Sequence, residues 1–156
     1  MKKTTIGILL KIAIIMLGIT GLLCCLMMGR ILEYILPGFS GTTHSIWLYS
    51  LYFCALPCFV SLAPAWIIST NIAKKRAFSP ENATFTKHIG YLMAGETLLV
   101  ALTNTLMLVT GRSYFALFLS FSLIIAIFLA VSICAFVLSS LLENASVLQN
   151  QSDYTI

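Results

Sequence analysis

Residues 114–142 read YFALFLSFSLIIAIFLAVSICAFVLSSLL, a stretch without a single charged side chain. A helix needs about 20 apolar residues to cross a bilayer, so this stretch is long enough to span the membrane and to tilt within it. Three further apolar runs precede it, at about residues 5–28, 46–68 and 89–110. The sequence therefore predicts an all-α fold, an integral membrane four-helix bundle that forms a single four-span transmembrane domain over residues 1–156.

The composition is typical of a membrane protein and does not indicate an enzyme. The chain is 60% hydrophobic and 9% charged, whereas soluble domains average roughly 45–50% apolar and 25% charged residues. With 156 residues, four spans leave only loops and a short tail, with no room for a catalytic domain. No glycine-rich phosphate loop, nucleophile motif or histidine and acid pair at metal spacing is present. We therefore expect no enzyme activity, no cofactor and no metal site, and we interpret the five cysteines as packing residues.

The first apolar run is not typical of a cleaved signal peptide. A secretory signal has an apolar region of about 7–15 residues followed by small residues at the cleavage site. This run is longer and ends in Leu22, Leu23, Cys24 and Cys25. We expect it to remain as the first membrane span.

The basic residues predict the orientation of the chain in the membrane. Seven of the nine lie near one set of span ends, while Arg30 and Arg112 lie near the other; the seven are Lys2, Lys3, Lys11, Lys74, Lys75, Arg76 and Lys87. Basic residues near span ends favour the cytoplasmic side. The expected location is therefore a bacterial inner membrane, with both termini, the loop 69–88 and the tail 143–156 in the cytoplasm. Two glycosylation triplets, at Asn82 and Asn144, would then face the cytoplasm and are coincidental.

Prolines mark two features of the expected helices. Pro57 and Pro64 lie inside the second span, where each removes a backbone donor, so we expect a bent helix whose freed carbonyls are met by neighbouring helices, Ser61 or water. The bend is either a structural kink or a hinge that moves. Ser79 followed by Pro80 is typical of a helix start, which predicts that the third helix begins before its apolar run.

Two charged residues, Lys11 and Glu96, lie inside expected spans. A charge in the middle of a span costs at least about 2.5–3.5 kcal/mol on insertion scales, so each needs a reason. Counted from the span starts, both lie about 9 to 11 Å deep. Three interpretations remain open: they form an ion pair, or Lys11 extends to the headgroups while Glu96 is protonated, or Glu96 belongs to a proton or substrate pathway.

A line of polar residues accompanies Glu96 on the third helix. Thr103 follows Glu96 by seven residues, and Asn104 follows Thr97 by the same interval. This spacing places all four on one broad helical face, which we expect to turn toward the bundle interior. Hydroxyl and amide groups on such a face bond between helices at about 0.6 kcal/mol each.

Several short motifs resemble the bacterial membrane family called domain of unknown function 2975. They are the segment from Ala77 to Asn82, the pair Leu56 and Pro57, and the ending from Leu141 through Ala145 to Asp153, Tyr154, Thr155 and Ile156. Tyr154 stands where the family commonly has an aliphatic residue, and Glu96 is not part of the family pattern. The family has no established biochemical activity. Its members are often encoded beside a small helix-turn-helix regulator, which implies a membrane protein that holds or controls a cytoplasmic transcription factor.

The expected cytoplasmic segments contain a candidate contact surface. Leu142, Ala145 and Leu148 follow helical spacing and offer a small apolar face to a partner. The candidate contact residues are Lys74, Lys75, Arg76, Phe78, Leu148, Tyr154 and Ile156. Contact with anionic lipid headgroups is the alternative use of the basic residues, and we expect no direct binding of nucleic acid.

Two functional hypotheses follow. The first is a non-enzymatic partner or regulator that engages a cytoplasmic protein, with the bilayer and a second copy of the chain as further partners. The second is a small transporter, or an immunity protein that protects its own cell against a membrane-active peptide. That alternative would use the helix bundle and the outer loop containing Arg30, Glu33 and His44.

Overall fold

The computed structural model describes residues 3–35 and 41–153, which form four long α-helices. They are α1 (Lys3–Ile35), α2 (Thr42–Ala73), α3 (Pro80–Val109) and α4 (Phe115–Asp153). Each helix holds a stretch long and apolar enough to cross a membrane: Thr5–Tyr34, Thr42–Ala73, Pro80–Val109 and Phe115–Leu148. The predicted all-α class with four candidate membrane helices is confirmed.

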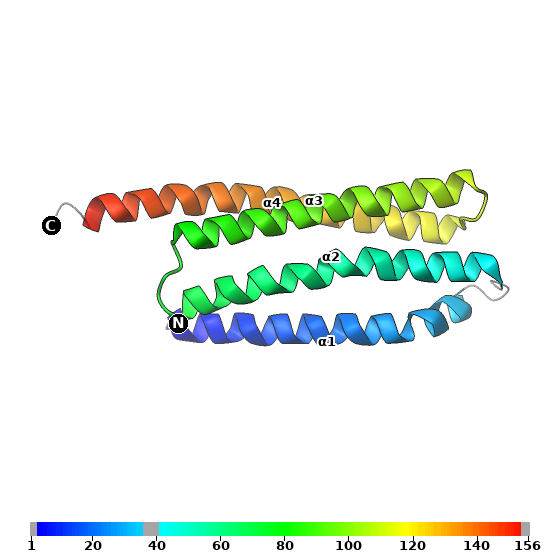
Figure 1. Ribbon diagram of the computed structural model, residues 1–156, viewed down its shortest axis with the longest axis horizontal. Helices are drawn as coiled ribbons and strands as arrows, with labels where there is room; N and C mark the ends of the chain where they lie inside the picture. The colour runs from blue at the N-terminus through cyan, green and yellow to red at the C-terminus, as the bar shows by residue number, and fades with distance from the viewer. Residues whose placement is uncertain (1–2, 36–40, 154–156) are drawn as a thin grey trace.

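The helices lie antiparallel in chain order, each packed against the next (Figure 1). The start of α1, the connector between α2 and α3, and the end of α4 lie at one end of the molecule (Figure 1). We call this the basic end, because it carries Lys74, Lys75, Arg76 and Lys87. The α3–α4 turn lies at the opposite end, which we call the turn end, together with Arg112.

The helices are longer than the apolar runs from which they were predicted. α1 continues to Ile35, and α4 continues to Asp153, so most of the expected polar tail is helical. Glu143 ends the apolar run of α4 but is itself a good helix former, so the helix continues past it. The predicted start of α3 is confirmed, because the Ser79 hydroxyl accepts a hydrogen bond from the Asn82 backbone N–H and Pro80 opens the helix.

α2 contains both prolines and bends along its length (Figure 1). The Ser61 hydroxyl donates to the Cys58 carbonyl at 2.6 Å. A proline removes the donor for the carbonyl four residues earlier, which here means the carbonyls of Phe53 and Val60. Ser61 therefore bonds a different carbonyl from the two that the prolines free.

α1 and α2 approach each other closely at the basic end. The Ser69 hydroxyl donates to the Gly7 carbonyl at 2.7 Å, and a Cβ atom on Gly7 would lie 2.7 Å from the Cβ of Ala73. Farther along the pair, the Tyr52 hydroxyl donates to the Cys25 carbonyl at 3.2 Å. Small residues let helix backbones come together in membranes, and hydroxyls then bond across the contact. The α1–α2 pair follows this rule.

α3 and α4 are joined in the same way. The Ser132 hydroxyl donates to the Gly90 carbonyl at 2.9 Å, and the Ser139 hydroxyl donates to the Ala83 carbonyl at 2.8 Å. Both donors and both acceptors are seven residues apart, so the antiparallel register stays constant over this stretch. The two serines therefore fix which turn of α4 lies beside which turn of α3.

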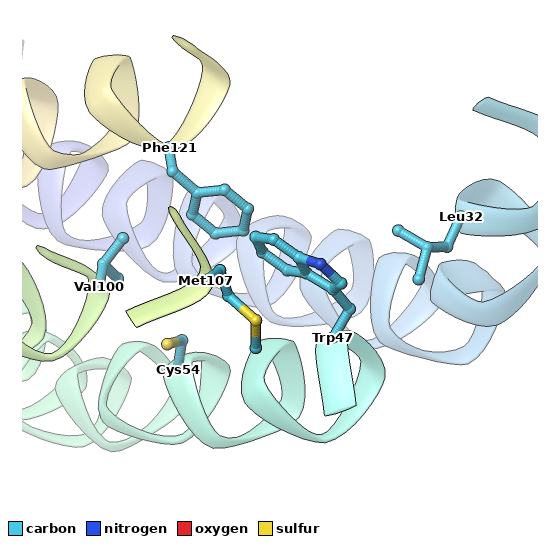
Figure 2. Close-up of a cluster of buried hydrophobic side chains, with 6 residues drawn as sticks. All are labelled: Leu32, Trp47, Cys54, Val100, Met107 and Phe121. Carbon is cyan, nitrogen blue, oxygen red and sulfur yellow. The ribbon is translucent and has the colours of Figure 1, made fainter. Parts of the chain in front are cut away.

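A hydrophobic cluster near the turn end takes residues from all four helices (Figure 2). Trp47 of α2 is fully buried in it, with its ring centroid 5.2 Å from that of Phe121 of α4. The Trp47 ring nitrogen donates to the Arg112 carbonyl at 3.0 Å. The other members are Leu32, Cys54, Val100 and Met107. This cluster ties α2 to the α3–α4 pair.

Candidate functional site

Asn82 holds the connector at the basic end in place. Its side chain is fully buried, and its amide nitrogen donates to the carbonyls of Arg76 and Ala77, both at 3.0 Å. Its amide oxygen accepts from the side chain of Asn71 at 2.8 Å. One side chain thus bonds the end of α2, the connector and the start of α3 together. The segment from Ala77 to Asn82, on which the family resemblance rests in part, has this structural role.

The connector presents its basic side chains to the surroundings. Lys74, Lys75 and Arg76 are exposed, and Lys75 adopts a left-handed backbone conformation with φ of 65°. Lys87 of α3 is also exposed, and the side chain of Phe78 in the connector is 53% exposed. These side chains form a basic surface with one aromatic ring beside it.

The end of α4 projects beyond the rest of the basic end (Figure 1). The register set by Ser139 and Ala83 places Leu142 level with Pro80, so residues 143–153 extend past the start of α3 by about 16 Å. Val147 and Leu148 are exposed on this projection. The predicted contact residues Tyr154 and Ile156 lie outside the described residues.

Glu96 lies near the middle of α3 and is fully buried. Neither of its carboxyl oxygens has a hydrogen-bond partner within the described part of the chain. Its neighbours across the contact with α2 include Cys54 and Cys58, with which it interacts electrostatically. A buried polar group without a partner is rare in folded proteins and needs a specific explanation.

The hypothesis that Lys11 and Glu96 form an ion pair is wrong in this structure. The ammonium group of Lys11 lies 5.1 Å from the centroid of the Trp66 ring on α2, a cation–π contact. α2 lies between α1 and α3, and Trp66 is eight residues, roughly 12 Å, along α2 from Cys58 beside Glu96. Equal distance from the span starts did not give equal depth, because α3 begins well before its apolar run.

Of the other members of the predicted polar face, Thr97 and Asn104 are buried and Thr103 is half-buried, and they have different neighbours. Thr97 is buried and donates to the Met93 carbonyl of its own helix at 2.8 Å. Asn104 is buried and donates to the Phe118 carbonyl of α4 at 3.4 Å, while its side-chain oxygen has no partner among the described residues. Thr103 lies beside Cys54 of α2. The face is thus divided between the contacts of α3 with α2 and with α4.

The contact between α2 and α3, which we call the seam, is hydrogen-bonded differently from the other two contacts. N–H donors join its two sides at its ends in the described chain, where Asn71 bonds Asn82 and Trp47 bonds the Arg112 carbonyl, and Cys54 of α2 interacts with Thr103 of α3 between these ends. Glu96 lies between these ends. The molecule is therefore built as two hydrogen-bonded hairpins, α1–α2 and α3–α4, joined along a seam with an unpartnered carboxyl group in its middle.

Two cavities lie along the seam, one on each side of Glu96. The larger, about 520 Å³, is on the side of the basic end and is lined by residues that include Pro64, His88 and Tyr91. The smaller, about 320 Å³, is on the side of the turn end and is lined by residues that include Ser50 and Thr103. Within the described residues, no three His, Cys, Asp or Glu side chains gather in a group that could hold a metal ion.

Two structural roles, those of the serines on α4 and of Asn82, were not predicted although the sequence contains a signal for each. Ser132 and Ser139 recur at seven residues on an otherwise apolar helix, and this helical repeat indicates a shared face that bonds to a neighbour. Asn82 was interpreted only through its glycosylation triplet and as part of the family motif. Its place in the first turn after a serine cap was the available signal for a role in the connector.

Comparison with known proteins identifies a family. The sequence model of the family described as Protein of unknown function (DUF2975) matches residues 10–156. No curated protein and no solved structure matches the chain.

Proposed function

We propose that this chain, which belongs to the DUF2975 family, is a non-enzymatic regulator in the bacterial inner membrane that holds a cytoplasmic protein at its basic end. The observation that carries this proposal is the projection of α4, residues 143–153, at the same end of the molecule as the exposed Lys74, Lys75 and Arg76. This arrangement offers a partner a helix to pack against and a charged surface to recognise.

The orientation of the chain in this proposal comes from its charges. The basic end carries most of the basic residues, and such residues favour the cytoplasmic side of a span. The connector, the start of α1 and the end of α4 share this end, so they would all meet the same compartment. A cytoplasmic partner can then contact the connector and the projection at once.

The chemistry of the surface defines the partner. Three adjacent bases attract a protein surface rich in Asp and Glu, and the exposed Val147 and Leu148 on one helix favour a partner with an apolar groove. The partner we propose is therefore an acidic cytoplasmic protein with such a groove. The small helix-turn-helix regulator that the family resemblance implies is the first protein to test.

Crosslinking in intact cells tests this proposal. A photo-crosslinking amino acid replaces Leu148, and the same substitution at Leu123 in the lipid-exposed middle of α4 is the matched control. We expect a crosslinked cytoplasmic protein at Leu148 and lipid at Leu123. Changing Lys74, Lys75 and Arg76 to Gln should remove the protein crosslink without removing the chain from the membrane, because the acidic partner loses its charge contacts.

Crosslinks from Leu148 that contain only lipid or a second copy of the chain would contradict the proposal. A protein crosslink that persists in the triple Gln variant would contradict the role of the basic residues.

One observation favours the alternative, a small transporter or self-protection protein: the buried Glu96 in the seam. The two functions respond differently to two changes. Glu96→Gln should abolish an ion-coupled activity while the chain inserts normally, whereas removal of residues 153–156 should impair only docking of a partner.

A further inference from the structure

The middle of the seam combines a carboxyl group without a partner, two cavities and a bent helix. Glu96 is fully buried and both its oxygens lack a hydrogen-bond partner among the described residues. The 320 Å³ and 520 Å³ cavities lie on either side of it. On the α2 side, Pro57 lies in the turn from Cys54 to Cys58 near Glu96, and Pro64 follows farther along the helix, so α2 is weakened at this level.

Among the described residues, no cation faces Glu96 from the helices around it. The thiols of Cys54 and Cys58 on α2 lie near it, and Cys25 of α1 lies near Cys58. The part of α4 level with Glu96, residues 122–130, has no titratable side chain. Lys11 is held against Trp66. An ionised carboxylate here would be a buried charge without a counterion, which proteins avoid by neutralising the group.

The surroundings favour a proton over a metal cation as the neutralising ligand. Hard cations such as sodium, magnesium and calcium need several oxygen ligands, and transition metals need a set of nitrogen, sulfur or oxygen ligands. The carboxyl oxygens of Glu96 have no hydrogen-bonding neighbour in the described chain, and no three metal-ligating side chains gather there. A proton needs no further ligand from the protein.

We propose that Glu96 is a proton-binding site in the middle of the membrane, and that release of its proton opens the seam between the two hairpins. With the proton bound, the neutral carboxyl group can stay in the closed seam. Without it, the carboxylate must be hydrated, and water reaches it when α2 and α3 separate between their bonded ends. The two flanking cavities are where that water enters. This inference rests on Glu96 and is independent of the docking surface at the basic end.

Labelling with a hydrophobic carbodiimide tests the site directly, because this reagent reacts with a protonated carboxyl group within a membrane. The probe is dicyclohexylcarbodiimide, applied to the full chain in phosphatidylcholine vesicles and followed by peptide mass spectrometry. We expect Glu96 to be modified at about pH 6, with a rate that falls about tenfold per pH unit once the carboxylate dominates. Sodium ions at constant pH should not protect it. Glu33, an exposed acid on α1, is the matched control, and Glu33→Gln should leave the labelling of Glu96 unchanged.

Cysteine alkylation tests the opening of the seam in the same vesicles. The rate of reaction of Cys58 with N-ethylmaleimide is divided by that of Cys134, an exposed thiol on α4, and the same ratio in Glu96→Gln is the reference for the pH dependence of the two thiols themselves. This ratio should rise several-fold between about pH 6 and about pH 9 in the wild type, since the ionised fraction of a carboxyl group changes about tenfold per pH unit. The rise should be much smaller in Glu96→Gln, which cannot ionise.

Three results would overturn the proposal. The first is an absence of Glu96 labelling at every pH, and the second is protection by sodium at constant pH, which would indicate a metal-cation site. The third is a Cys58 to Cys134 ratio that does not change with pH in the wild type or that rises equally in Glu96→Gln.

Discussion

Asn82 shows how a single side chain organises the basic end. All of its side-chain hydrogen-bonding groups are used, on Asn71, Arg76 and Ala77, and it has no exposed surface. The connector therefore has a defined shape although it is short and highly charged. A defined shape is what a surface needs if a partner is to recognise three adjacent basic side chains.

Substitution of Asn82 by Ala should lower the free energy of unfolding by about 1–3 kcal/mol, because buried carbonyl and amide groups lose their partner. Unfolding in detergent micelles, followed by circular dichroism as a denaturing detergent is added, measures this change. Thr84→Ala is the control, because Thr84 is exposed and bonds only the Pro80 carbonyl of its own helix. Equal stability of the two variants would show that Asn82 does not hold the connector.

Among the described glycines, Gly7 lies where two helices approach each other most closely. In Gly7→Ala the new Cβ would meet the Cβ, Cα and backbone nitrogen of Ala73 at 2.7 to 2.9 Å, so the helices must move apart. We expect a loss of about 1–3 kcal/mol in the same unfolding measurement. Gly95→Ala has open space around it and should be neutral or slightly stabilising, since Ala favours helix over Gly by about 1 kcal/mol. The reverse order of stability would contradict the packing of α1 on α2.

The positions of Lys11 and Glu96 could be predicted only in part from the sequence. Apolar runs identify both as intramembrane charges. Their depth depends on where each helix begins, and their neighbours depend on the lateral order of the helices. Neither quantity is set by hydropathy, so the ion-pair hypothesis failed while the need to explain Glu96 remained.

At the scale of the helices, the α3–α4 pair depends on many small contributions. Ser132 and Ser139 each donate to a carbonyl of α3. Interhelical bonds of this kind average about 0.6 kcal/mol in membranes, because an unfolded helix in the bilayer also finds partners. The register of the pair is therefore fixed by the repeat of the bonds more than by the strength of any one.

Replacing Ser132 and Ser139 together by Ala should lower the stability by only about 1 kcal/mol, twice the average for one bond. The same unfolding measurement compares this double variant with Ser120→Ala. Ser120 is the control because it is exposed and bonds only the Ala116 carbonyl of its own helix. A loss several times larger would mean that these hydroxyls do more than align the pair.

Helix starts were more predictable than helix ends. Ser79 and Pro80 fix the start of α3 through local chemistry that the sequence states directly. The end of α4 is set by where helix-forming residues stop, eleven residues after the apolar run ends at Leu142. Hydropathy indicates where a helix leaves the membrane, but it does not indicate where the helix ends. The sequence therefore predicted a polar tail with helical spacing after Leu142, and it did not predict that the helix itself continues to Asp153.

At the scale of the whole molecule, the basic residues gather at one end of a bundle whose lateral surface is apolar. Exposed large hydrophobic side chains cover all four helices, as a lipid environment requires. The bases near the other end are Arg30 and Arg112. The docking proposal requires the basic end to face the cytoplasm.

The most direct test of this claim is the accessibility of single cysteines in intact cells. Lys75→Cys and Arg112→Cys are each introduced into a chain whose five native cysteines are changed to Ala or Ser, and a membrane-impermeant maleimide is added from outside. We predict that the cysteine at position 112 reacts in intact cells and that the cysteine at position 75 reacts only after the membrane is permeabilised. Reaction at position 75 in intact cells, with position 112 protected, would place the basic end outside the cell and contradict the account.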